Sequence, residues 1–184
     1  MKIESLRFDE VMTRFHLEHD ADRAHESNTN QATEGLLGLA DAQLGGWSRV
    51  LLGRRHLRSV ILPWHESEGG DIKLVPKTGL RVVEAARKIA AMRELYAQQS
   101  QVCWRKIERA ARVPRAAVFL STRAIDSEHY AELETKDGLV HLDGLHRMIA
   151  WELDGLLAED ELLEAFVAGP RSVLAEIASN APED

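Results

Sequence analysis

The chain has 184 residues, of which 45% are hydrophobic, so it can build one sizeable core, and no internal repeat or low-complexity linker divides it. A net charge of −7 opposes nucleic-acid binding, because proteins that bind DNA draw most of their affinity from Lys and Arg near phosphates. No apolar run approaches the length of a membrane span and no signal peptide opens the sequence, so we expect a cytoplasmic protein.

The N-terminal part, residues 1–58, is expected to be mainly helical. Apolar residues recur at helical spacing in its first segment, at Leu6, Phe8, Val11, Met12 and Phe15. Gly45 and Gly46 interrupt a second stretch of small and apolar residues, 36–52.

Residues that commonly bind transition metals do not form a recognisable motif. His16, His19, Asp20 and His25 lie close together in the sequence, but they lack a helical HExxH pattern and cysteine partners. The single cysteine, Cys103, excludes an intramolecular disulfide and argues against a cysteine-based zinc site, so we interpret it as a packing residue. The sequence therefore predicts no metal site.

A short strand is predicted at 59–62, and the sequence Pro-Trp-His-Glu follows it at 63–66. A carboxylate beside a substrate hydroxyl can accept its proton or orient it for attack. Glu66 carries a carboxylate that could serve in this way, and Glu68 and Asp71 lie nearby and offer the same chemistry.

The segment 78–112 has the composition and the apolar spacing of helices, and it is expected to form one long helix or two shorter ones. The break between two helices would fall near residues 98–100. Because basic and acidic residues alternate along this segment, its charged face indicates solvation rather than nucleic-acid binding.

A second apolar strand is predicted at 117–121, and polar residues follow it. Ser121, Thr122 and Arg123 carry hydroxyl and guanidinium donors that suit a phosphate or a substrate carboxylate.

The segment 136–153, KDGLVHLDGLHRMIAWEL, combines a turn, a short strand, a second Asp-Gly and an amphipathic helix. Asp143 precedes the predicted helix, Gly144 allows close approach of the backbone, and His146 and Arg147 lie in the first helical turn. A helix N-terminus offers free N–H groups and a positive dipole end, and the guanidinium adds a forked donor. This arrangement favours binding of an anion.

The remaining residues, 158–184, are expected to be helical. Apolar residues lie on one side of the stretch 159–167, Gly169 and Pro170 end it, and a last helix follows.

These motifs resemble the ParB/sulfiredoxin superfamily, whose members carry a strand, an Asp-Gly-x-His-Arg bend that binds nucleotide phosphates, and a helix. The resemblance covers about residues 117–157 and is nearest to the free serine kinase branch, in which a histidine stands at the position of Leu145. It implies an α+β fold, with a small mixed sheet and helices in a core at 59–157 and a helical insertion at about 78–112. The whole chain is expected to be a single domain.

The same resemblance implies a small-molecule kinase that uses ATP or ADP with Mg²⁺ to phosphorylate a hydroxyl group. The catalytic residues would be Glu66, Asp143 and His146. The residues that hold the nucleotide would be Gly144, His146, Arg147, Ser121 and Thr122. The residues that bind the substrate would be His65 and Arg123.

Two other functions stay open on the same scaffold. One is a ParB-like regulator that binds a nucleotide, or a DNA-associated protein. The other is a tailoring enzyme that uses no nucleotide and holds an anionic substrate on the His-Arg bend. Substrate identity and oligomeric state do not follow from the sequence.

Overall fold

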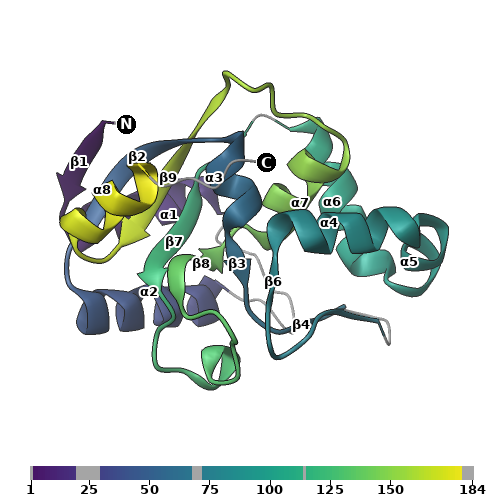
Figure 1. Ribbon diagram of the computed structural model, residues 1–184, viewed down its shortest axis with the longest axis horizontal. Coiled ribbons are helices and arrows are strands. Elements are labelled where there is room, and N and C mark those ends of the chain that lie inside the picture. Colours follow the sequence, from purple (N-terminus) through teal and green to yellow (C-terminus); the bar gives the residue numbers. More distant parts are fainter. Residues whose placement is uncertain (1, 20–29, 68–71, 114, 180–184) are drawn as a thin grey trace.

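The computed structural model describes residues 2–19, 30–67, 72–113 and 115–179. Within these ranges it has the expected α+β fold, a seven-stranded mixed sheet with helices on both faces (Figure 1). The strands of this sheet are β1 (Ile3–Leu6), β2 (Trp47–Gly53), β3 (Ile61–Leu62), β6 (Leu80–Arg81), β7 (Val118–Arg123), β8 (Asp137–Asp143) and β9 (Leu162–Ala168). The strands β4 (His65–Glu66) and β5 (Lys73–Val75) pair separately.

The order across the sheet is β1-β2-β9-β7-β8-β3-β6. Strand β7 runs parallel to β9 and β3 runs parallel to β8, whereas the other neighbours are antiparallel. The described helices are α1 (Phe8–Glu18), α2 (Asn30–Leu44), α3 (Arg54–Ser59), α4 (Val82–Ala91), α5 (Arg93–Gln99), α6 (Gln101–Arg112), α7 (Leu145–Leu153) and α8 (Arg171–Ser179), and a 3-10 turn, η1, spans Glu128–Tyr130. Every one of them is too short or too polar to reach across a lipid bilayer.

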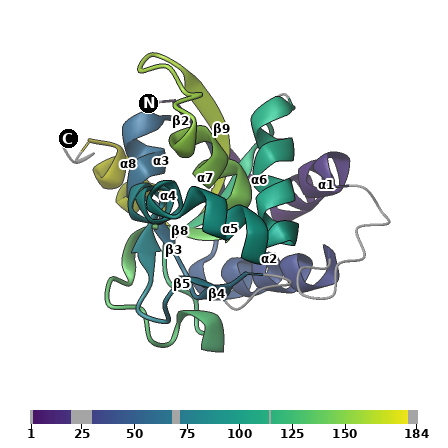
Figure 2. The ribbon, with the colours of Figure 1, turned by 90° about the vertical axis from the view of Figure 1, so that its right-hand side faces the viewer.

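Alternating residues of the central strands belong to two different cores. In β9, Leu163, Ala165 and Val167 pack with residues of α3, α4, α6 and α7, whereas Phe166 and Ala168 pack with residues of α1 and α2. Because successive side chains of a strand point to opposite faces, the sheet is the middle layer between two helical layers. Figure 2 shows α3 and α8 well apart from α1 and α2.

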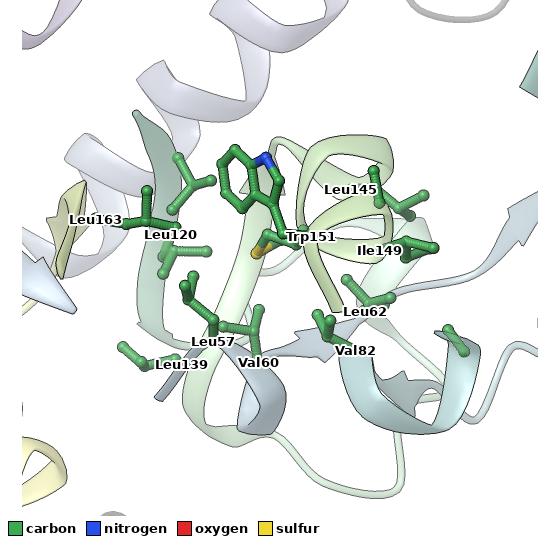
Figure 3. Packing of buried hydrophobic residues seen from close by; sticks show 14 of the residues in the cluster. Leu57, Val60, Leu62, Val82, Leu120, Leu139, Leu145, Ile149, Trp151 and Leu163 are labelled. Atoms are coloured by element: carbon green, nitrogen blue, oxygen red, sulfur yellow. The ribbon is translucent and has the colours of Figure 1, made fainter. Parts of the chain in front are cut away.

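Helix α7, which follows the Asp-Gly motif, is anchored in the larger core. Its Trp151 is 2% exposed and belongs to the same cluster as Leu120 of β7 and Leu163 of β9. In Figure 3 the indole of Trp151 extends from α7 toward these strands. The burial of this large side chain fixes the helix, and with it the bend at its N-terminus, against the sheet.

The ends of the chain differ from the sequence expectation of helices. Strands β1 and β2 lie within the part expected to be helical, 1–58, and the two glycines at 45–46 have positive φ in the turn that leads into β2. Strand β9 lies within 158–184, between β2 and β7. Both faces of β9 are covered, so its apolar residues do not alternate with polar ones and its sequence pattern did not distinguish it from a helix.

Within the segment 78–112 the residues from Val82 on are helical, as predicted, but they form three helices instead of one or two, and strand β6 occupies Leu80–Arg81, where a helix was expected. The expected break is present at Ser100, and a second one, which was not predicted, lies at Met92. Helix α4 begins at Val82, and Arg81 is its N-cap residue. The backbone N–H of Arg81 donates a hydrogen bond of 2.7 Å to the carboxylate of Glu84 in the first turn. That bond satisfies one of the donors that a helix N-terminus leaves open.

Candidate functional site

The bend between β8 and α7 is a tightly packed structure. Gly144 has φ +108°, and a Cβ at this position would lie 2.9 Å from Cγ1 of Val118, so the bend needs glycine. Nε2 of His141 accepts a hydrogen bond of 3.0 Å from the backbone N–H of Leu145. Burial lowers the pKa of His141 to about 4, so this ring is neutral near pH 7 and can act as the acceptor. One of the N–H groups expected to face an anion is thus already bonded within the protein.

The charged groups of the bend also contact one another. The guanidinium of Arg147 lies 2.5 Å from Oδ2 of Asp143 and 3.9 Å from Glu18 of α1. Nε2 of His19 lies 3.2 Å from the same Asp143 oxygen, and the ring of His19 stacks on Phe15 with centroids 4.1 Å apart. Asp143 is only 5% exposed, so this network joins the end of α1 to the bend. An incoming phosphate would have to compete with two carboxylates for Arg147.

Of the other N-terminal residues in the histidine-rich segment, His16 is exposed and lies 3.0 Å from Glu34. Asp20 and His25 lie outside the described residues.

The residues predicted after β7 lie away from the bend. In the antiparallel register, Phe119 is opposite Asp143, whereas Arg123 is opposite Asp137 at the other end of β8. Ser121 is fully buried and donates a hydrogen bond of 2.7 Å to the Arg123 carbonyl. Thr122 and Arg123 line a pocket at that other end. The structure therefore does not bring these three residues together with His146 and Arg147.

Glu66 lies on β4, where it is half exposed and 4.0 Å from Nζ of Lys73. Adjacent residues of a strand point to opposite faces, so Glu66 and His65 have different surroundings. Glu68 and Asp71 lie outside the described residues.

The side chain of His65, by contrast, lies close to those of His146 and Cys103. The rings of His65 and His146 have centroids 5.2 Å apart at 79°, and Sγ of Cys103 lies 3.5 Å from Nε2 of His65. One ligand atom from each of the three residues lies within 4.8 Å of the others. The cluster is built from β4, α6 and the first turn of α7, with the cysteine buried and both histidines partly exposed.

One pair in this cluster already has the separation of two zinc ligands. Zn–S bonds of about 2.3 Å and Zn–N bonds of about 2.0–2.1 Å at a tetrahedral angle place sulfur and nitrogen about 3.6 Å apart. The separation between Cys103 and His65 is 3.5 Å. Thiolate and imidazole are ligands that Zn²⁺ prefers, whereas Mg²⁺ prefers oxygen, so the cluster does not suit the Mg²⁺ expected with a nucleotide.

A family model described as "Family of unknown function (DUF6309)" matches residues 1–183. The chain belongs to the DUF6309 family. No curated protein and no solved structure matches it.

Sequence reasoning linked His65 and His146 with a site in this DUF6309 protein but missed Cys103, which lies beside them. His65 and Cys103 are 38 positions apart, and no short spacing pattern connects them. Cys103 was interpreted as a packing residue, and its complete burial agrees with packing as well as with a ligand role. The three residues come together only because α6 packs against α7 in the folded chain.

Proposed function

We propose that this DUF6309 protein is a zinc protein that binds one Zn²⁺ through His65, Cys103 and His146. The observation that carries the proposal is the placement of one ligand atom from each residue within 4.8 Å of the others. The separation of 3.5 Å between Sγ of Cys103 and Nε2 of His65 supports it, because two ligands of a tetrahedral zinc ion stand at nearly this distance. Cys103 is the third residue of α6, where the positive end of the helix dipole favours the thiolate that a metal binds.

The ligand set favours a zinc ion that takes part in chemistry. Structural zinc sites use four protein ligands, whereas catalytic sites use three and keep one position for water or substrate. Among the described residues, the cluster supplies three. The two histidines are partly exposed, so a ligand can approach from their side. Zinc held in this way lowers the pKa of a bound water to about 7, which supplies a nucleophile for hydrolysis at neutral pH.

The test is metal binding by the full chain and three variants. Wild-type protein should bind one equivalent of Zn²⁺, and Co²⁺ in its place should give a thiolate-to-cobalt charge-transfer band. Cys103→Ser should abolish that band, and His146→Gln should weaken Zn²⁺ binding at least tenfold. His16→Gln is the matched control, because this histidine is exposed and pairs with Glu34 on another face. Circular dichroism checks that each variant folds.

Two results would refute the zinc proposal. One is a wild-type protein that takes up no stoichiometric Zn²⁺. The other is a folded His146→Gln variant that binds Zn²⁺ as tightly as His16→Gln.

Nucleotide-dependent phosphotransfer, with ATP or ADP and Mg²⁺, stays a prediction. The order of strand β8, the Gly144 bend and helix α7 supports it. The contacts of Arg147 with Asp143 and Glu18 oppose it, because the cation is already neutralised. Phosphorus NMR of each nucleotide with Mg²⁺ and candidate hydroxy compounds is the direct test. The ParB-like regulator, the tailoring enzyme and the cytoplasmic location also stay predictions.

A further inference from the structure

A pocket of about 610 Å³ lies at the end of the sheet where β7 ends and β8 begins. Its walls come from the ends of β3, β6, β7 and β8, from α8, and from the ends of α2 and α3. His146 follows the opposite end of β8, so the pocket is separate from the proposed zinc site. Pockets of about 300–1,000 Å³ are the usual size for small-molecule ligands.

The rim of the pocket carries charges of both signs. Arg81 and Arg123 supply guanidinium groups, and Asp137 and Glu176 supply carboxylates. All four side chains are exposed, and none of them forms an ion pair with another described residue. Arg123 and Asp137 are direct partners in the β7–β8 register, so opposite charges stand side by side without a salt bridge. These groups are therefore available to a ligand that carries both charges.

Apolar side chains form another part of the pocket wall. Ile61 and Leu139 come from the sheet and are buried, whereas Val173 and Ile177 come from α8. The two α8 residues are four positions apart, so they lie on one face of the helix. The side chain of Val173 is 37% exposed, so it can contact an apolar group of a ligand in the pocket.

We propose that this pocket binds a small amphipathic zwitterion of dipeptide size. Its carboxylate pairs with Arg81 or Arg123, its ammonium pairs with Asp137 or Glu176, and its apolar side chains contact Val173 and its neighbours. The volume favours a dipeptide over a free amino acid, which would leave much of the pocket filled with water. A ligand with only negative charge would bring its anion close to two carboxylates that it cannot neutralise.

The test compares three matched ligands by isothermal titration calorimetry with the full chain. Leu-Leu carries both charges, N-acetyl-Leu-Leu lacks the ammonium, and Leu-Leu-amide lacks the carboxylate. Leu-Leu should bind, and each blocked compound should bind at least tenfold more weakly.

Two exposed substitutions assign the charges. Arg123→Gln should weaken binding of Leu-Leu and reduce the ratio of its affinity to that of Leu-Leu-amide. Asp137→Asn should reduce the ratio of the affinity of Leu-Leu to that of N-acetyl-Leu-Leu. Arg93→Gln on α5 is the control, since that guanidinium pairs with Asp154 away from the pocket. No heat with Leu-Leu at millimolar concentration, or equal binding of Leu-Leu and N-acetyl-Leu-Leu, would overturn the proposal.

Discussion

His141 should make the stability of the protein depend on pH in the acid range. Its Nε2 accepts the backbone N–H of Leu145 at the start of α7, which only a neutral ring can do. Burial lowers its pKa to about 4 in the folded state, and the unfolded chain has the ordinary value of about 6.5. The unfolded state therefore binds the proton more readily. The contribution to stability is complete above pH about 6.5 and is lost as the pH falls toward about 4.

The size of this effect follows from the two pKa values. A difference from about 6.5 to about 4, at about 1.4 kcal/mol per pH unit, gives an upper limit of about 3.5 kcal/mol. His141 as a residue is partly exposed, although Nδ1 of its ring is buried, so solvent screening brings the measured value below this limit.

Urea unfolding between about pH 7.5 and about pH 4.5 measures the effect, with a chelator present to keep metal from the sample. His141→Gln is the informative variant, because the amide oxygen of glutamine can occupy the position of Nε2 and accept the same N–H but does not titrate. The wild type should lose more stability than the variant over this pH range, by an amount below the upper limit because about pH 4.5 is still above the folded pKa of about 4. His16→Gln, which removes an exposed histidine, should follow the wild type. Identical pH profiles of the wild type and His141→Gln would refute the reasoning.

Two further predictions concern stability. Gly169→Ala should destabilise the fold by about 1–3 kcal/mol in urea unfolding, because Gly169 has φ +132° and an added Cβ would collide with the buried side chain of Thr122. Arg147→Ala should cost about 1.5–3 kcal/mol, because it leaves the buried Asp143 carboxylate without its closest cation. Its control, Arg93→Ala, removes a more exposed pair and should cost at most about 1 kcal/mol; equal losses in the two arginine variants would contradict this account.

The local structure around the motif at 136–153 was predictable from the sequence. Its short strand, bend and helix depend on neighbouring residues, and strand β8 and helix α7 occur there in that order. The turn predicted at Asp137 and Gly138 was wrong, because these two residues are already part of β8. The partners of the motif were not predictable. Arg147 contacts Glu18, and His19 contacts Asp143, across more than a hundred positions of the chain, and no local pattern indicates such contacts.

Contacts between distant parts of the chain also explain the two larger differences between the sequence predictions and the structure. Strand β9 has both faces covered by elements distant in the sequence, so its burial, rather than any periodicity, decides its conformation. The His65, Cys103 and His146 cluster depends on how α6 packs against α7. Sequence reasoning identified the two histidines as functional candidates through a family resemblance, and the cysteine had no signal of its own.

The order of strands has a consequence for how copies of the chain meet. The outermost strands of the sheet are short, since β1 has four residues and β6 has two, whereas β2, β8 and β9, which lie inside it, have seven each. A sheet edge recruits a second chain through its unpaired backbone N–H and C=O groups, and a short edge presents few of them. The arrangement keeps the long, apolar strands away from intermolecular pairing and so protects the folded protein against edge-to-edge aggregation.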